Sequence, residues 1–280
     1  MVPTPRRSSL GAYGFRLTNI PEALDLLVEA PERWPELELV RVAPEGEEPA
    51  EEQVTADHAR LRLSGGGWAE VDRVAARAEL QVPTGTTDGA LVHPFLASVA
   101  LVMSRWRGHE GFHGGGIVAG GGVWGVLGDK TAGKSTLLAW LGSHGVGVMS
   151  DDVLIIDGMT VLAGPRSVDL REEAAAWLGA GEPMGRVGAR DRWRVPLPAV
   201  PAELPLRGWI TLAWGDEIAV EPLRGAERFQ ALLPHRGVRL VPPDPAGLVR
   251  FSALPHLRFT RPQDWEQLPA ASEQLLAALG

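Results

Sequence analysis

The residues Gly128-Asp129-Lys130-Thr131-Ala132-Gly133-Lys134-Ser135 fit the pattern G-x-x-x-x-G-K-[ST] at every position. In such a loop, backbone N–H groups turn inward around a phosphate, and the helix that follows points its positive end at the same anion. Lys134 is placed to reach the terminal phosphates, and the Ser135 hydroxyl to ligand Mg²⁺. We therefore predict a nucleotide-phosphate site over Gly128 to Ser135, extended to Thr136, in preference to a purely structural glycine-rich turn.

Two adjacent carboxylates, Asp151 and Asp152, follow Lys134 after enough chain for one helix and one strand. The chain can thus return beside the loop on a neighbouring strand, where adjacent side chains point to opposite sides. One carboxylate can then support a metal ion, while the other accepts the proton of an incoming hydroxyl. Those are the two tasks of phosphoryl transfer. The alternative is a helix cap or a solvated turn.

His113 precedes the loop, at the start of the first strand of a predicted hairpin over residues 113–127. Simple hairpin reasoning places it at the end of the sheet far from the loop, unless the strand bends. On residue type alone we therefore expect a core or surface histidine.

Three motifs together resemble the HPr serine kinase/phosphorylase family, whose core is shared with ATP-dependent phosphoenolpyruvate carboxykinase. They are Phe112-His113-Gly114, the loop Gly128 to Ser135, and Ser150-Asp151-Asp152-Val153. The resemblance implies that Asp152 is the base that activates the acceptor hydroxyl, and that Asp151 and Ser135 hold the metal. It also implies that Lys134 binds the β- and γ-phosphates, and that His113 lies near the transferred group.

The whole chain looks most similar to the HPr-kinase-like proteins of ribosomal peptide clusters, including lasso peptide clusters. Their implied role is phosphorylation of a peptide. The stretch from Ala163 to Arg171 does not match the Glu-Val-Arg-Gly-like signature of HPr kinases, which leaves open whether HPr is an acceptor. The resemblance also makes a homo-oligomer plausible, and whether the reverse, phosphorolytic reaction runs stays open.

Several arginines follow the acidic pair. Arg166 is close enough in the chain to reach the phosphates, where it would stabilise charge on their oxygens, or it pairs with surface acids instead. The basic segment from Arg186 to Arg194 is either a mobile clamp for an anionic group on the acceptor or a solvated loop. Ten tryptophans are scattered through the chain, and we expect them in the core and not in a stacking platform.

The elements that must position these residues have the periodicity of an α/β protein with a mixed sheet. Residues 1–90 are predicted to form a small α+β accessory domain that recognises substrate, and residues 91–280 a P-loop kinase domain of the HPr kinase and carboxykinase type. The predicted elements around the site are strands Val123–Leu127, Val146–Met149, Val153–Ile156, Thr160–Ala163 and Arg207–Trp214, and helices Phe95–Trp106, Ser135–Leu141, Asp169–Leu178, Glu227–Leu233 and Glu266–Leu279.

The composition of the chain argues against several classes of binding partner. The chain has 280 residues, a formal net charge of −8 and no cysteine, which argues against nucleic acid, anionic membranes and disulfides. The apolar stretch Ala90 to Met103 is broken by His93 and Pro94 and is too short to span a bilayer. We expect a cytoplasmic enzyme that uses ATP and Mg²⁺ on a peptide or protein hydroxyl. The alternatives are a small-metabolite kinase and a non-catalytic nucleotide-binding module.

Overall fold

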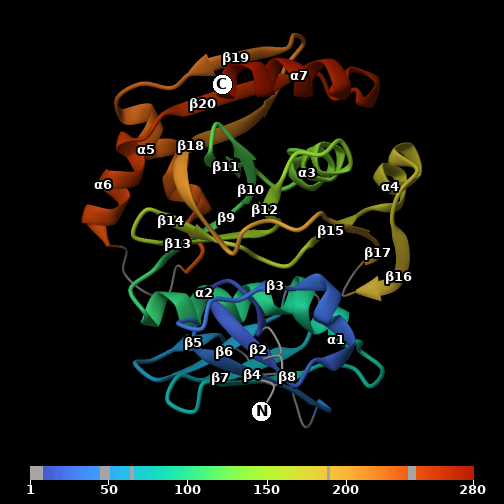
Figure 1. Ribbon diagram of the computed structural model, residues 1–280, viewed down its shortest axis with the longest axis vertical. Coiled ribbons are helices and arrows are strands. Elements are labelled where there is room, and N and C mark those ends of the chain that lie inside the picture. Colours follow the sequence, from blue (N-terminus) through green and yellow to red (C-terminus); the bar gives the residue numbers. More distant parts are fainter. Residues whose placement is uncertain (1–8, 45–50, 64–65, 188–189, 239–243) are drawn as a thin grey trace, which may run out of the picture.

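The computed structural model describes the chain except residues 1–8, 45–50, 64–65, 188–189 and 239–243. It consists of an N-terminal sheet, a layer of helix against it, and a larger mixed sheet with helices on its other side (Figure 1). The mixed sheets and their covering helices confirm the predicted α/β class.

The N-terminal sheet is built from short strands that alternate buried and exposed side chains, as in β6, where Ala59 and Leu61 are buried. Such alternation gives one face to the core and one to solvent. A 3₁₀ helix, Pro21–Leu26, follows β2 (Phe15–Thr18). The order is β3 (Val28–Glu29), β1 (Leu10–Ala12), β2 (Phe15–Thr18), β4 (Glu36–Val42), β8 (Arg77–Gln81), β7 (Trp68–Asp72), β6 (His58–Arg62) and β5 (Gln53–Val54).

A helical layer covers this sheet: α1 (Asp88–Ala90), one irregular turn over Leu91–Phe95, and α2 (Leu96–Trp106). Among the described residues, only Asp88–Trp106 has a helix long and apolar enough to cross a membrane, and 78% of its apolar window is buried inside the molecule. A single hydrophobic cluster runs from the N-terminal sheet through α2 to β13. The packing is therefore continuous across residue 90, and the division into two domains stays a prediction.

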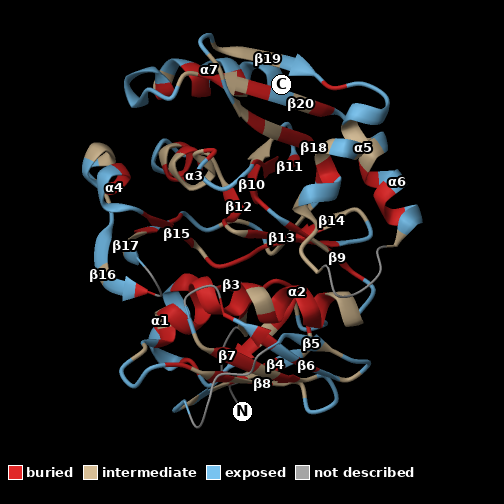
Figure 2. Cartoon of the chain, turned by 180° about the vertical axis from the view of Figure 1, so that it is seen from behind, coloured by how far each residue is buried: buried red, intermediate tan, exposed pale blue. Residues whose placement is uncertain are grey.

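The central sheet has the order β12 (Val148–Ser150), β10 (Gly115–Ala119), β11 (Gly122–Leu127), β18 (Glu203–Trp214), β14 (Thr160–Leu162), β13 (Val153–Asp157) and β9 (Glu110–His113). Strand β11 is buried along its length, antiparallel to β10 and parallel to β18. Beyond β18 lie β20 (His256–Arg261) and β19 (Ala219–Pro222). Figure 2 shows buried residues concentrated in α2 and in this sheet.

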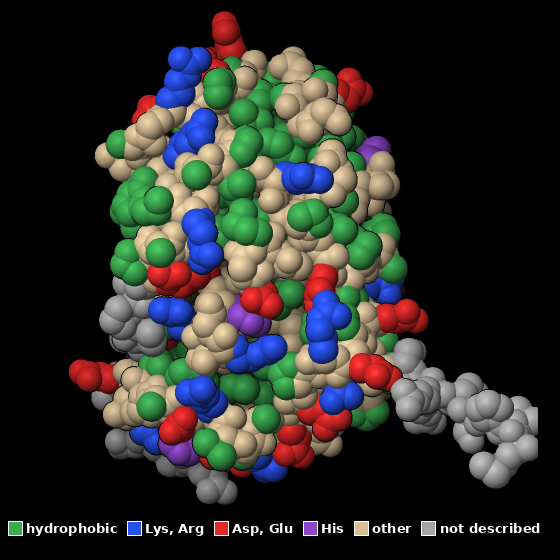
Figure 3. All heavy atoms as spheres, turned by 60° about the vertical axis from the view of Figure 1, so that its left-hand side comes forward, with side chains coloured by type: hydrophobic (Ala, Val, Ile, Leu, Met, Phe, Trp, Pro, Cys, Tyr) green, Lys and Arg blue, Asp and Glu red, His purple; other side chains and the backbone are tan. Residues whose placement is uncertain are grey.

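The remaining elements surround one end of the central sheet. Helix α3 (Lys134–Ser143) follows β11, and α7 (Leu268–Leu279), after a 3₁₀ turn at Trp265–Gln267, packs beside it. A small sheet of β15 (Ser167–Leu170), β17 (Arg190–Pro196) and β16 (Glu182–Val187) stands next to α4 (Glu172–Leu178). Helices α5 (Ala226–Leu232) and α6 (Pro245–Ala253) cover the opposite side. Figure 3 shows the molecule from that direction, with acidic and basic side chains interspersed mainly in the lower half of the face.

Two expectations about these elements were wrong in part, and two elements were not predicted. The helix predicted over Asp169–Leu178 begins only at Glu172, because Ser167–Leu170 forms β15 and pairs with β17. The segment from Arg186 to Arg194 contributes to the hairpin β16–β17, apart from residues 188–189, which lie outside the described residues. Strand β20 and helix α6 were not predicted, since their short apolar runs lie between prolines.

Candidate functional site

The loop between β11 and α3 has the geometry of an anion cradle. Strand β11 ends at Leu127 and α3 begins at Lys134. Thr131 and Gly133 have left-handed backbones, with φ of 74° and 77°, which turn the chain tightly before the helix. Gly133 occupies the helix N-cap and has no side chain to cap it. The first N–H groups of α3 are therefore available to an anion.

Lys134 holds its ammonium group over this loop. Its Nζ donates hydrogen bonds to the carbonyl oxygens of Gly128 at 2.5 Å and Asp129 at 3.2 Å. Burial lowers the pKa of Lys134, and the nearby carboxylates of Asp151 and Asp152 oppose that shift. The cation thus lies next to the loop's carbonyls, where it can contact the outer oxygens of a bound phosphate chain.

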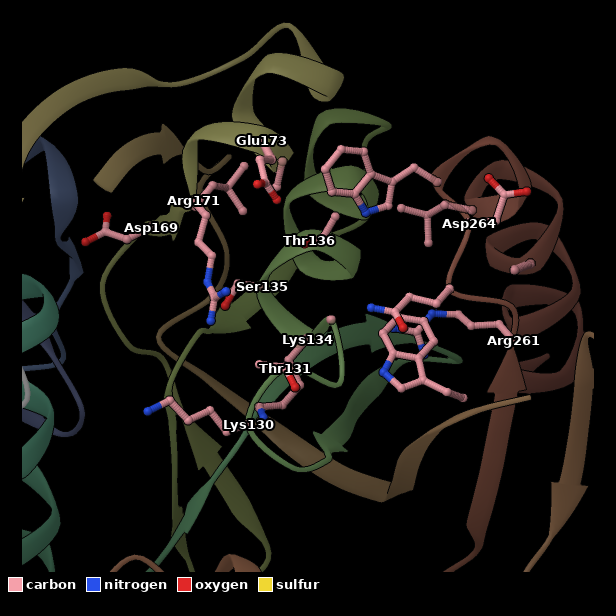
Figure 4. A pocket seen from close by; sticks show the side chains of 18 of the residues that line it. Lys130, Thr131, Lys134, Ser135, Thr136, Asp169, Arg171, Glu173, Arg261 and Asp264 are labelled. Atoms are coloured by element: carbon pink, nitrogen blue, oxygen red, sulfur yellow. The ribbon is translucent and has the colours of Figure 1, made fainter. Parts of the chain in front are cut away.

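A cavity of about 410 Å³ opens above the loop, within the roughly 300–1,000 Å³ typical of small-molecule sites. The predicted loop residues Lys130, Thr131, Gly133, Lys134, Ser135 and Thr136 line it. Gly128, Asp129 and Ala132 are not among the described residues that line it. Figure 4 shows the labelled loop side chains on one side of the cavity, and Arg261 and Asp264 on the other.

The acidic pair returns beside the loop, as its spacing predicted. Ser135 donates from its Oγ to Oδ1 of Asp151 at 3.2 Å. Asp151 follows β12 and is only 2% exposed, whereas the Asp152 side chain is 40% exposed and lines the cavity. Asp152 also has φ of 66°, a conformation that costs a non-glycine residue about 1 kcal/mol or more. The two adjacent carboxylates thus differ in exposure, although one oxygen of each lies within 4.8 Å of the other.

Asp151 has an environment that suits a bound cation. Burial raises the pKa of its carboxyl group well above the usual value, and the negative charge of Asp152 raises it further. Hydrogen bonds from the Asp152 backbone and the Ser135 hydroxyl oppose the shift. A divalent cation would offset both causes, since it replaces lost solvation and screens the second carboxylate. The donor set of Ser135 and Asp151 is thus compatible with Mg²⁺.

His93 is a site residue that the sequence reasoning missed. One ligand atom from each of His93, Asp151 and Asp152 lies within 4.8 Å of the other two. His93 reaches this position because its backbone is extended, with φ of −148° and ψ of 122°, as is usual before a proline. The signal in the sequence was a lone histidine followed by Pro94 inside an apolar run.

His113 lies at the loop end of the sheet, so the expectation from hairpin geometry was wrong. In an antiparallel hairpin the first residues of one strand lie opposite the last of the other, and Gly115 pairs with Val126. The backbone N–H of Gly114 also donates to the carbonyl of Asp152 at 3.0 Å. The exposed His113 side chain is not among the residues that line the cavity, and its role near the phosphoryl group stays a prediction.

The arginines divide into two groups. Arg171, Arg190 and Arg192 line the cavity. Arg166, which we expected at the phosphates, is not among the described residues that line it and instead donates to the carbonyl of Leu197 at 3.2 Å. Arg194 is held by Asp169 away from solvent. Arg190 and Arg192 of the basic segment thus lie at the cavity while Arg194 is part of a buried ion pair, and a role for Arg166 at the phosphates stays a prediction.

Arg261 closes the far side of the loop and was also missed. It is 3% exposed and donates from Nη2 to the carbonyl of Ala132 at 2.7 Å. Burial lowers the pKa of its guanidinium to about 10, so it stays charged at neutral pH. Its Cζ lies 4.4 Å from the ring centre of Trp214. No sequence motif marks this residue, since it approaches the loop only through strand β20.

Two tryptophans correct the expectation that all of them are core residues. Trp214 is 40% exposed and Trp265 is 36% exposed, and both line the cavity. Trp265 also packs against Trp177, with ring centres 5.8 Å apart. Flat apolar surfaces of this kind stack readily on planar aromatic groups.

Comparisons with known proteins add little to this geometry. No protein-family model matches the chain, and no curated protein matches it. Among solved structures, the Hpr(Ser) kinase/phosphatase from Coxiella burnetii is similar, at 14% sequence identity over 61% of this chain and 99% of that chain, with a TM-score of 0.29. So low a TM-score carries no argument about function, and the conclusions below depend on the residues of the site.

Proposed function

We propose that this chain is a kinase that transfers the γ-phosphoryl group of ATP, with Mg²⁺, to a hydroxyl group of a peptide or protein. The observation that carries the proposal is the contact between the loop and the acidic pair, in which the Ser135 hydroxyl bonds to Asp151 while the adjacent Asp152 faces the same cavity. A phosphate cradle alone supports binding, whereas a cradle with a metal-binding carboxylate and a second, accessible carboxylate supports transfer.

In this proposal the phosphates occupy the loop from Gly128 to Thr136. The N–H groups at the start of α3 and the Lys134 ammonium bind their oxygens. Arg171, Arg190 and Arg192 line the cavity and stabilise the charge of the transferring group from the other side. When bound, Mg²⁺ at Ser135 and Asp151 neutralises phosphate charge.

Asp152 has the role of general base. Its carboxylate accepts the proton of the acceptor hydroxyl while that oxygen forms a bond to the γ-phosphorus. The bond between the γ-phosphorus and the β,γ-bridging oxygen breaks, and the electron pair leaves with ADP. The 40% exposure of the Asp152 side chain leaves room for an acceptor to approach, and a positioned base contributes about 10²–10⁴-fold to rate.

The rest of the cavity supports a nucleotide with an aromatic base. Trp214 and Trp265 provide faces on which adenine can stack. A peptide acceptor would enter beside Arg190 and Arg192, which can bind a carboxylate or phosphate on it. This assignment agrees with the predicted membership of the HPr-kinase-like proteins of ribosomal peptide clusters. A cytoplasmic location, a substrate-recognising role for residues 1–90 and a homo-oligomeric state also belong to the proposal.

The test is incubation of the purified chain with ATP, Mg²⁺ and candidate precursor peptides, read by mass spectrometry as a gain of one phosphate. Asp152→Asn should lower the transfer rate by about 10²–10⁴-fold with little change in ATP affinity. Asp216→Asn, at an exposed position of the turn between β18 and β19 and not among the residues that line the cavity, is the control and should transfer normally. Full activity in Asp152→Asn would refute the assignment of the base.

The same assay separates the alternatives. Transfer to a small hydroxylated metabolite, with none to peptides, would favour a metabolite kinase of this fold. Tight ATP binding without transfer to any acceptor would favour a non-catalytic nucleotide module.

A further inference from the structure

The backbone makes a tight turn just after β12, and Asp152 lies at the centre of that turn. The N–H of Val153 donates to the carbonyl of Asp151 at 2.8 Å, and Asp152 between them has φ of 66°. A hydrogen bond across two residues with a positive φ at the central one is the rare, strained form of the γ-turn. Such a backbone persists only where the surrounding structure holds it in place. The groups that contact this γ-turn therefore fix the position of the Asp152 carboxylate.

Tyr13 reaches the γ-turn from the N-terminal sheet. It lies in the two-residue turn between β1 and β2, where Tyr13 and Gly14 have φ of 57° and 84°. Positive φ at both positions is what a tight hairpin of this kind requires. The N–H of Tyr13 donates to the carbonyl of Ala163, just after β14, at 2.6 Å. The tip of the hairpin is thus attached to the central sheet.

The Tyr13 hydroxyl contacts the γ-turn itself. The side chain is fully buried, and its Oη donates to the carbonyl oxygen of Asp151 at 3.4 Å. Burial raises the pKa of this hydroxyl well above its usual value, and the negative charges of Asp152 and Asp151 raise it further. The hydroxyl therefore keeps its proton at neutral pH and remains a donor. It shares its acceptor with the N–H of Val153, which closes the γ-turn.

Packing of the Tyr13 ring adds to this long hydrogen bond. Gly164 lies between the ring and the chain that leads into the γ-turn. A Cβ at Gly164 would lie 2.6 Å from a ring carbon of Tyr13 and 2.8 Å from the Cβ of Ser150. The N–H of Gly164 also donates to the carbonyl of Met149 at 2.7 Å. Contacts this close leave no space in which the γ-turn could relax towards the ring.

We propose that Tyr13 is a positioning residue for Asp152. Its hydroxyl and ring hold the γ-turn closed, so that the Asp152 carboxylate stays at the cavity. Tyr13 itself is not among the described residues that line the cavity, and it acts only through the backbone of Asp151. The effect on rate rests on the proposed function, in which Asp152 is the base, whereas the effect on the γ-turn does not. The loss of one hydrogen bond typically changes an equilibrium about three- to tenfold, and we expect changes of that size.

The first measurement is amide hydrogen exchange, followed by NMR on the full chain without nucleotide. Tyr13→Phe removes the hydroxyl and keeps the ring. The N–H of Val153 should then exchange about three- to tenfold faster relative to that of Ile155 in the same strand, because the γ-turn opens more often. Phe15→Leu is the matched control, since it trims another buried ring of the same hairpin, and it should leave this ratio unchanged.

The second measurement is the transfer assay, with a peptide that gains phosphate in it. Tyr13→Phe should lower kcat about three- to tenfold and leave the KM for ATP within about twofold, because the phosphate loop is undisturbed. Phe15→Leu should keep both constants. A purely structural role for Tyr13 would instead lower the midpoint of urea unfolding in both variants and kcat in neither.

An unchanged exchange ratio in Tyr13→Phe would overturn the inference whatever the rates, and so would an unchanged kcat. If Tyr13→Phe does not fold, Asp152→Gly should restore folding in the double variant, because glycine adopts a positive φ without strain; a double variant that stays unfolded would also overturn the inference. Faster exchange in a chain that transfers no phosphoryl group would support the hold of Tyr13 on the γ-turn and refute the kinase. Transfer at full rate by Tyr13→Phe would do the reverse.

Discussion

Replacing Arg194 with methionine should destabilise the protein strongly, because Arg194 is the cation of a buried ion pair. Its guanidinium donates twice to Asp169, whose side chain is fully buried, at 2.9 and 3.1 Å. It also donates to the backbone carbonyls of Gly89, at 2.8 Å, and His93. The residue therefore ties the small sheet to the segment that precedes α2.

The expected loss of stability follows from the buried polar groups that each variant leaves unpaired. Arg194→Met leaves the Asp169 carboxylate buried and unpaired, which typically costs 3–5 kcal/mol. The two carbonyls that lose a donor add about 1 kcal/mol each. In the double variant Arg194→Met with Asp169→Leu, the unpaired charge is gone and only the carbonyls are unsatisfied. We therefore expect a loss of about 5–7 kcal/mol in the single variant and about 2 kcal/mol in the double variant.

Urea unfolding at pH 7, followed by circular dichroism, measures these differences as shifts of the midpoint at constant slope. Arg190→Met, at an exposed position of the same strand, is the stability control and should change the free energy of unfolding by less than about 0.5 kcal/mol. The reasoning would be refuted if Arg194→Met cost less than about 1 kcal/mol. It would also fail if the double variant lost as much as the two single variants together.

Two further predictions concern pH and the nucleotide base. Burial, followed by nearby positive charge, lowers the pKa of His256 to about 4, against about 6.5 in an unfolded chain. Because the unfolded chain then binds a proton that the folded protein does not, the free energy of unfolding falls as the pH decreases from 6.5 towards 4, by up to about 3 kcal/mol. Urea unfolding at pH 7 and pH 5 should show a smaller loss of stability in His256→Asn than in the wild-type protein. An equal loss in both would contradict the prediction. Trp265→Ala should weaken ATP binding about tenfold and leave the binding of inorganic tripolyphosphate unchanged, since stacking involves only the base. Calorimetry with both ligands measures the two affinities. Equal losses of affinity for the two ligands would rule out base stacking.

The parts of the site that sequence predicts well are local. The strand Val123–Leu127, the loop and the start of α3 are consecutive, so the motif and its flanking apolar and helix-forming residues suffice to place them. The position of Asp151 and Asp152 beside the loop is predictable because one helix and one strand bring the chain back to the same sheet edge. In these cases a short stretch of sequence determines the local geometry, and the residue types determine the chemistry.

The parts that sequence did not predict depend on contacts between distant segments. Arg261 meets the carbonyl of Ala132, 129 positions earlier in the chain, through a strand with no motif. His93 enters the site from the helical layer against the N-terminal sheet, and an alternating run at Ser167–Leu170 forms a strand only because β17 pairs with it. Neither the hydrophobic periodicity nor the spacing of motifs predicts which distant segments will pair.

The site depends on the N-terminal sheet as well as on the P-loop region. Asp88, at the start of α1, accepts hydrogen bonds from the Arg41 side chain at 2.6 Å and from the backbone of Glu22 at 3.1 Å. These bonds anchor the segment that carries His93. The Tyr13 hydroxyl, from the turn after β1, donates to the backbone carbonyl of Asp151 at 3.4 Å.

The segment that carries His93 and the backbone of Asp151 are thus both held in part by the first ninety residues. A movement of that sheet relative to the central sheet would change the distance from His93 to the acidic pair. Such a movement would change the surroundings of the acidic pair before it changed the loop, whose Lys134 contacts are local.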